Sequence, residues 1–147
     1  MLDSAASPAS ITSVLRTIRA TLKGSGRLLV VVGVLGSPEP TQLCEIGVAA
    51  AELADKLLLT AGSLRRKPPV APIEGLAAGA ALVPGALVEV IPQRRAAIGE
   101  ALKEMRFVGT DVEVMELHLR LGPRQRSRPF ERGCVAMLVN KVQHRLA

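Results

Sequence analysis

Apolar residues recur along this chain with two spacings, one typical of helices and the other typical of buried strands. The first segment repeats apolar residues every three or four positions: Ile11, Val14, Leu15, Ile18 and Leu22. These positions share one face of a helix. Ser7-Pro8 before them supply an N-cap and a first helical residue, and Gly24 and Gly26 are expected to end the helix. The opening segment therefore predicts an amphipathic helix.

The rest of the chain alternates continuous apolar runs with helical periodicity. Strands are predicted at 28–32, 56–60, 87–91 and 111–117, and helices at 41–54, 73–81 and 94–105. Gly33 to Pro38 read as a turn, and the imperfect alternation over 111–117 predicts an edge strand. This order predicts a three-layer, Rossmann-like α/β fold, in which a mostly parallel sheet carries helices on both faces.

We expect one domain over 1–147, with a basic linker at 118–130 and a final amphipathic helix at 131–147. In sheets of this kind ligands gather at the carboxyl ends of the strands. Those ends are expected at 33–37, 60–67, 91–94 and 117–120, so they are the candidate binding rim.

The net charge of +6 is unevenly placed along the 147 residues. Basic and acidic residues balance through Leu117, so the excess lies in 118–147. An arginine-rich tail suggests nucleic-acid binding by charge, which would be salt-sensitive and lost on truncation after Leu117. The chain lacks Trp and Tyr, and Phe107 and Phe130 cannot build a base-stacking platform. Nucleic acid is therefore an unfavoured partner, and a solvated tail is the simpler interpretation.

Few residues suit metal or redox chemistry. Cys44 and Cys134 have no CxxC spacing and read as buried thiols in a reducing compartment, and His118 and His144 lack spaced partners. No metal site is expected. No apolar run reaches membrane-spanning length, so no membrane association is expected. We expect a cytoplasmic protein, with an organelle stroma as the alternative, because the Ser- and Ala-rich start faintly resembles a transit peptide.

Five segments, taken in order, resemble the C-terminal domain of the Mur ligases, and the branch most similar is the muramyl-tripeptide synthetase. The matching segments are Asp3-Ser4-Ala5-Ala6-Ser7-Pro8, Gly26-Arg27 with the strand up to Gly33, Ala54-Asp55 with the strand up to Thr60, Val88-Glu89-Val90-Ile91, and Pro129-Phe130-Glu131-Arg132. The family performs ATP-dependent ligation of amino acids to peptidoglycan precursors. In it, this domain closes over ATP and presents the incoming amino acid.

The resemblance implies a small set of site residues. Asp3 would bond a nucleotide ribose, and Gly33 and Gly36 would let a phosphate approach the following helix. Arg65 and Arg66 would grip a substrate carboxylate. The alternatives are structural: a helix N-terminal acid for Asp3, an ordinary turn for the glycines, and a solvated loop tip for the arginines. No residue is assigned a catalytic role.

The departures from the family pattern are as informative as the matches. Ala6 stands at the family's histidine, and Leu117 to Leu121 retain nothing of its Gly-Lys-Gly-His-Glu motif. No phosphate-binding loop of the form GxxxxGK[ST] occurs, and phosphoryl transfer needs such a cradle. The isolated chain is therefore expected not to catalyse ligation. ATP and Mg²⁺ would be used only with a partner P-loop ligase core. The alternative is a degenerate, non-catalytic interaction domain, with another protein chain as its partner.

Overall fold

The computed structural model describes residues 2–3, 7–22, 26–36, 39–61, 71–108, 112–121 and 135–138. The strands are β1 (Leu2–Asp3), β2 (Arg27–Gly36), β3 (Lys56–Ala61), β4 (Val88–Val90), β5 (Val112–Leu121) and β6 (Val135–Leu138). The helices are α1 (Pro8–Thr21), α2 (Pro40–Leu53), α3 (Ala71–Ala80) and α4 (Arg94–Val108). The predicted alternation of strands and helices is confirmed.

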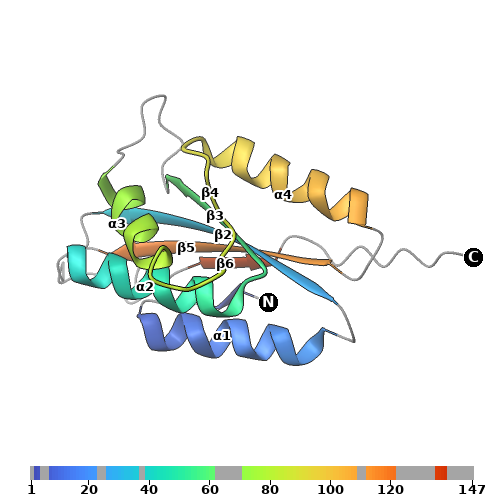
Figure 1. The fold of residues 1–147 in the computed structure, drawn as a ribbon, viewed down its shortest axis with the longest axis horizontal. Coiled ribbons are helices and arrows are strands. Elements are labelled where there is room, and N and C mark those ends of the chain that lie inside the picture. Colours follow the sequence, from blue (N-terminus) through green and yellow to red (C-terminus); the bar gives the residue numbers. More distant parts are fainter. Residues whose placement is uncertain are drawn as a thin grey trace, which may run out of the picture.

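One six-stranded sheet runs through the middle of the molecule, in the order β1-β6-β5-β2-β3-β4 (Figure 1). The pairs β5–β2, β2–β3 and β3–β4 are parallel, and β1–β6 and β6–β5 are antiparallel. Helices α1, α2 and α3 lie on one face and α4 on the other (Figure 1). The predicted three-layer fold with a mostly parallel sheet is therefore confirmed.

Two apolar cores hold the layers together. The larger core packs α1, α2 and α3 on the sheet, and its fully buried side chains include Ile11, Leu15, Ile46 and Leu76. The smaller core lies under α4, where Ala97 and Ala101 contact the sheet. Alternate residues of β2 and β3 contribute to opposite cores, as strand geometry requires. Burial on both faces explains why these strands read as continuous apolar runs.

The first helix forms as the sequence predicts. Ser7 is the N-cap and Pro8 takes the first turn, while Ser7 and Ser10 exchange side-chain and backbone hydrogen bonds in a capping box. The helix ends at Thr21, with Leu22 as its C-cap, so it stops earlier than the glycines suggested. Asp3 lies in β1 and not in the first turn of α1, which corrects its alternative interpretation as a helix N-terminal acid.

The predicted turn at 33–38 is wrong over Gly33 to Gly36, because β2 continues to Gly36. Strands on both sides supply hydrogen-bond partners: Gly33 aligns with Thr60 of β3 and with His118 of β5. Continuous ladders outweigh the local preference of a glycine for turns. The glycines therefore lie inside a strand and at its last residue.

Three expectations for the C-terminal part are also corrected. β5 is not an edge strand, because β6 pairs with its outer side. Residues 118–121 belong to β5 rather than to the linker, and the remainder of that segment, 122–130, lies outside the described residues. Residues 135–138 form β6 rather than part of the final helix, whose other positions also lie outside them. A four-residue apolar run suits a strand as well as a helix, and pairing with β5 decides between them.

Candidate functional site

The carboxyl ends of the parallel strands meet at one edge of the sheet. There β2 ends at Gly36, β3 at Ala61 and β4 at Val90. Helices α2 and α4 begin near this edge, at Pro40 and Arg94. Ligands of open α/β sheets bind at such an edge, because loops and helix N-termini converge there. We call it the carboxyl-end rim, and it is the candidate site.

One side of the rim is fixed by hydrogen bonds to a single carbonyl. The Pro92 oxygen accepts from the Ala61 amide at 3.2 Å and from Thr60 Oγ1 at 3.3 Å. The Thr60 residue is only 1% exposed, so its hydroxyl needs this partner. The Ile91 amide adds a bond to the Leu59 oxygen at 2.9 Å. These contacts tie the turn between β4 and α4 to the end of β3.

Asp3 and Gly36, two residues assigned to nucleotide binding by the resemblance, are not brought together. Asp3 aligns with Ala136, Ala136 with Leu117, and Leu117 with Val32. Gly36 lies three strands from Asp3 and four residues farther along β2, a separation of roughly 20 Å from strand spacing and rise. Asp3 therefore lies on the outermost described strand on its side of the sheet, level with the middle of β2, and not at the rim.

The other assigned residues lie in different places. Gly36 is at the rim, and Gly33 lies inside β2, where it separates Thr60 from His118 across the sheet. Arg65 and Arg66, the expected carboxylate clamp, lie outside the described residues. Cys134 and His144 do so as well, whereas Cys44 is a half-buried free thiol on α2.

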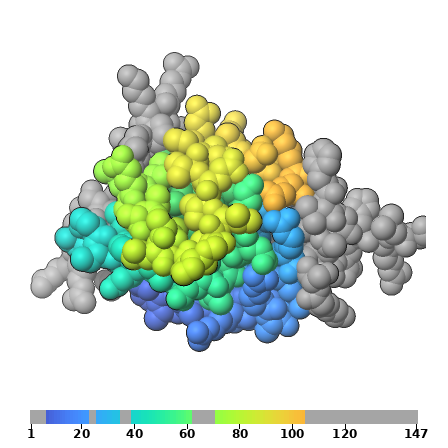
Figure 2. Space-filling model, in the orientation of Figure 1, coloured from blue at the N-terminus to red at the C-terminus, as the bar shows by residue number. Residues whose placement is uncertain are grey.

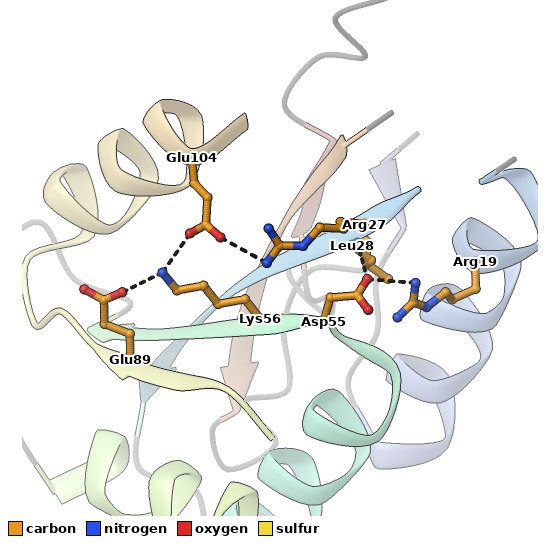
Figure 3. A network of polar contacts seen from close by, with 7 residues as sticks. All are labelled: Arg19, Arg27, Leu28, Asp55, Lys56, Glu89 and Glu104. Atoms are coloured by element: carbon orange, nitrogen blue, oxygen red, sulfur yellow. Dashed lines mark hydrogen bonds and ion pairs between the residues drawn. The ribbon is translucent and has the colours of Figure 1, made fainter. Parts of the chain in front are cut away.

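Four charged residues form a network at the other end of the strands from the rim, near the amino ends of β2 and β3 (Figure 3). They are Arg27, Lys56, Glu89 and Glu104. Lys56 Nζ contacts Glu104 at 2.7 Å and Glu89 at 2.9 Å, and Arg27 contacts the other oxygen of Glu104 at 3.1 Å. The register places Arg27, Lys56 and Glu89 on the sheet face that α4 covers. The network therefore fastens the C-terminal half of α4 to the starts of the strands.

The network shifts two pKa values in the directions expected for ion pairs. Hydrogen bonds to Glu104 and then to Glu89 raise the pKa of Lys56 above its ordinary value, despite partial burial. Burial alone would raise the pKa of Glu104, but Lys56 and Arg27 outweigh it and lower that pKa. Both shifts favour the charged forms of Lys56 and Glu104, so the network acts as a set of ion pairs and not as a proton relay.

Asp55 forms a second polar contact, in the turn from α2 into β3 (Figure 3). Its Oδ2 accepts from the Leu28 amide at 2.6 Å and pairs with Arg19 at 2.8 Å, while the Asp55 amide donates to the Leu28 oxygen at 2.9 Å. Arg19 Nε also donates to the Leu53 oxygen at 3.0 Å. Burial alone would raise the pKa of Asp55, but the Arg19 and Leu28 contacts outweigh it and hold this pKa below its usual value. Asp55 thus joins α1, β2 and β3.

Sequence reasoning missed both polar clusters as structural features. Arg27 and Asp55 stood inside the segments that carried the family resemblance, yet nothing in their spacing identified their partners. Glu104 lies 77 residues after Arg27 in the chain, so only the fold brings them together. Both clusters are satisfied ion pairs away from the rim, which argues for stability rather than chemistry.

The described residues contain neither a cluster of metal ligands nor a membrane-spanning helix. No group of three or more His, Cys, Asp or Glu side chains among them could hold a metal ion. Within the same residues, no helix combines the length and the apolar character needed to cross a membrane.

Comparison with known proteins identifies the family. Residues 1–112 match the family model described as Mur ligase, glutamate ligase domain. Over 109 residues the chain is 35% identical to UDP-N-acetylmuramoyl-L-alanyl-D-glutamate–2,6-diaminopimelate ligase from Streptomyces avermitilis, a match that covers 72% of this chain and 21% of that protein. The chain therefore spans about a fifth of the length of this curated relative.

Solved structures support the fold. Folylpolyglutamate synthase from Mycobacterium tuberculosis, complexed with ADP and AMPPCP, superposes with a TM-score of 0.54 at 21% identity, over 82% of this chain and 26% of that one. Its ADP complex gives 0.52 at 23% identity, over 78% and 26%. At this identity the likeness concerns the fold alone. The family match over 1–112 is independent of it, and it shows that the chain belongs to the Mur ligase family through its glutamate ligase domain.

Proposed function

We propose that this chain presents an amino acid at its carboxyl-end rim for ATP-dependent ligation to a peptidoglycan precursor, together with a P-loop-bearing ligase core. The observation that carries the proposal is the 35% identity to a diaminopimelate ligase over 109 residues. The matched family segment, residues 1–112, includes the strand ends Gly36, Ala61 and Val90, which form the rim.

The described residues do not fit ATP and magnesium by themselves. Asp3 and Gly36 are separated by roughly 20 Å, as the strand geometry indicates. No phosphate-binding loop occurs in the sequence, and the described side chains assemble no cluster of metal ligands. We therefore assign the nucleotide chemistry to the core and derive no step through ATP on this chain. On its own we expect the chain to be inactive.

The role left to this chain is to bind and orient the incoming amino acid. Arg65 and Arg66 follow the end of β3 at Ala61 in the sequence, and a guanidinium can hold a carboxylate through two parallel hydrogen bonds. The clamp on Thr60 and Ala61 by the Pro92 carbonyl keeps this end of β3 fixed relative to α4. A fixed strand end limits the motion of whatever the following loop holds.

The test is complementation of a core in solution. A diaminopimelate-adding Mur ligase that lacks its C-terminal domain is mixed with this chain, and amino-acid-dependent phosphate release is measured. We expect turnover only in the mixture, and a loss of at least tenfold with Arg65→Ala/Arg66→Ala. Arg16→Ala is the matched control, because Arg16 is exposed on α1, away from the rim. Turnover by the chain alone would contradict the proposal, as would a mixture that remains inactive.

A non-catalytic interaction domain is the second candidate. It is favoured by Ala6 at the family's histidine and by the loss of the family motif over Leu117 to Leu121. Titration calorimetry with diaminopimelate and with ATP separates the two candidates. Heat of binding for diaminopimelate supports the ligase-type role, and the absence of heat for both ligands supports the interaction domain.

A further inference from the structure

The side edge of the sheet, which runs along strand β4, carries exposed apolar side chains. Among the described strands, β4 is the last on its side of the sheet. Among the residues whose exposure is described, the large apolar side chains most exposed to solvent all lie in or just before this strand: Leu82 at 68%, Leu87 at 59%, Val90 at 48% and Val88 at 37%. In Figure 2 the yellow-green surface of this segment faces the viewer.

The backbone of β4 is also open on this side. Leu87 accepts from the Leu57 amide at 2.8 Å, and Ile91 donates to the Leu59 oxygen at 2.9 Å. In a parallel pair, alternate residues bond to the neighbouring strand, so positions 87, 89 and 91 face β3. The N–H and C=O groups of Val88 and Val90 therefore point away from the sheet.

The charged side chain of β4 is held in an ion pair rather than left free to guard this edge. Natural edge strands are commonly protected by charged side chains that repel another strand. Glu89 is the charged residue of β4; its side chain is 42% exposed, and its carboxylate is held by Lys56 at 2.9 Å on the face that α4 covers. Positions 88 and 90, whose backbone groups point away from the sheet, both carry valine.

The sequence of the strand has its own two-fold symmetry. Leu87-Val88-Glu89-Val90-Ile91 reads apolar, apolar, acidic, apolar, apolar in either direction. In an antiparallel pair centred on Glu89, Val88 lies opposite Val90 of the other copy and Leu87 opposite Ile91. Every apolar position then faces an apolar position, which an arbitrary peptide would not provide. This symmetry is the argument for a second copy of the same chain as the occupant.

We propose that β4 is a self-association edge, at which two copies of this chain pair antiparallel across a two-fold axis at Glu89. Val88 and Val90 face their counterparts as hydrogen-bonded pairs, in which each residue both donates and accepts. The two six-stranded sheets then join into one continuous sheet. The exposed Leu87 of each copy then lies opposite Ile91 of the other. This association does not depend on the ligase role.

The two Glu89 residues meet at the axis, and Lys56 makes this possible. Like charges directly opposite each other destabilise a strand pair. Each Glu89 already has a lysine partner, so the axis holds two ion pairs rather than two bare carboxylates. The contact is short, so we expect a weak dimer, populated in roughly the 10 µM to 1 mM range and not below it.

Sedimentation velocity over that concentration range tests the proposal. We expect the sedimentation coefficient to rise with concentration for the native chain. Val90→Pro removes one outward N–H without touching the bonds to β3, so it should give a monomer of unchanged circular dichroism. Val90→Lys places a charge on the edge strand that repels a second strand, so it should also give a monomer. Ala96→Lys adds an equal charge at an exposed site on α4 and should leave the dimer intact.

A cysteine at the axis tests the register directly. In an antiparallel pair of this type the two residues 89 have Cα atoms about 4.5 Å apart, within disulfide range. Glu89→Cys in a Cys44→Ala/Cys134→Ala background should therefore crosslink to itself on mild oxidation. Gln93→Cys in the same background is the control, because its counterpart would lie opposite Gly85 and not opposite itself.

Each result is decisive. A chain that stays monomeric at 1 mM, roughly the upper limit for a contact this small, would overturn the proposal and leave the edge to another protein. A dimer that survives Val90→Pro, or that crosslinks through position 93 and not 89, would show association through a different surface. Either of these results would overturn it too.

Discussion

The contact between α2 and α3 depends on glycines and gives a sharp stability prediction. A Cβ added at Gly79 would lie 2.0 Å from the Cys44 carbonyl oxygen and 2.8 Å from the Cys44 Cα. A Cβ at Gly47 would lie 2.2 Å from the Leu76 carbonyl oxygen. The atoms approached belong to helix backbones, which cannot rotate away as a side chain can. Gly79→Ala must therefore push the helices apart.

The size of the effect follows from these distances. Ordinary contact for a Cβ begins at 3.4 Å. A Cβ at 2.0 Å from the Cys44 carbonyl oxygen is 1.4 Å too close, so the two helix backbones must separate by about that distance at this point. Such a shift loosens Ile73 and Leu76, which are 2% and 0% exposed. Overpacking of this kind costs about 1–3 kcal/mol, and the helix propensity of alanine returns about 1 kcal/mol at most. We expect a net loss of up to about 2 kcal/mol.

Gly99→Ala is the matched control. Gly99 also lies within a helix, α4, and nothing stands within 4 Å of a Cβ built there. This variant should gain up to about 1 kcal/mol, because alanine is the better helix former. The two variants make the same chemical change in helices, so the difference between them isolates the steric contact.

Urea unfolding followed by circular dichroism at the helix band measures both variants. Tryptophan fluorescence is not an option, because the chain has no Trp and no Tyr. A destabilisation of 2 kcal/mol would lower the melting temperature by roughly 4–8 °C for a chain of this size. If Gly79→Ala proves as stable as Gly99→Ala, the close approach of α2 and α3 is refuted.

Two further predictions concern the helix cap and the ion pairs. Ser7→Ala should cost about 1 kcal/mol, because it removes the capping box, while Ser13→Ala within the same helix should change stability little. Equal losses for the two serines would contradict the cap. Asp55 and Glu104 have lowered pKa values, so their contribution is complete above their ordinary values of 3.8 and 4.5 and is lost as the pH falls through the lowered ones. Lys56 has a raised pKa, so its contribution is complete below 10.5 and is lost as the pH rises further. Lys56→Met should therefore flatten the acid limb of a stability–pH curve by about 1 kcal/mol or less, because these groups are partly exposed. An unchanged limb would argue against the pairs.

Much of the fold could be predicted because periodicity and burial agree over most elements. The apolar stripe from Ile11 to Ile18 is buried as expected, and the runs that became β2 and β3 are covered on both faces. Prediction failed where pairing with distant strands decides the structure. Gly33 extends a strand because β3 and β5 flank it, and Val135 to Leu138 form a strand because β5 offers an unpaired side.

The candidate site could be predicted only in part. The order of strands identified the rim, and Gly36 lies there. The grouping of Asp3 with the glycines failed, because β1 joins the sheet at its far edge through β6, a pairing that no local pattern reveals. The Pro92 carbonyl, which fixes the rim, has no sequence signature at all, since its role depends on backbone geometry at Thr60.

The placement of β5 and β6 changes how the basic C-terminal segment has to be tested. Truncation after Leu117 would remove the last four residues of β5 and all of β6, the strand that lies between β1 and β5 in the described sheet. Any lost binding would then report a broken sheet rather than lost charge.

Arg124→Gln/Arg126→Gln/Arg128→Gln removes charge without removing a strand of the described fold. The chain has hardly any aromatic residues, so we expect DNA binding to be weak and purely electrostatic. If all three arginines contact phosphates, the slope of log affinity against log salt should fall by about 2.7 in magnitude in the triple variant. Fluorescence anisotropy with labelled DNA measures both slopes. Sequence-specific binding that persists at high salt in this variant would refute the charge-only interpretation, because charge contacts are the ones that salt weakens.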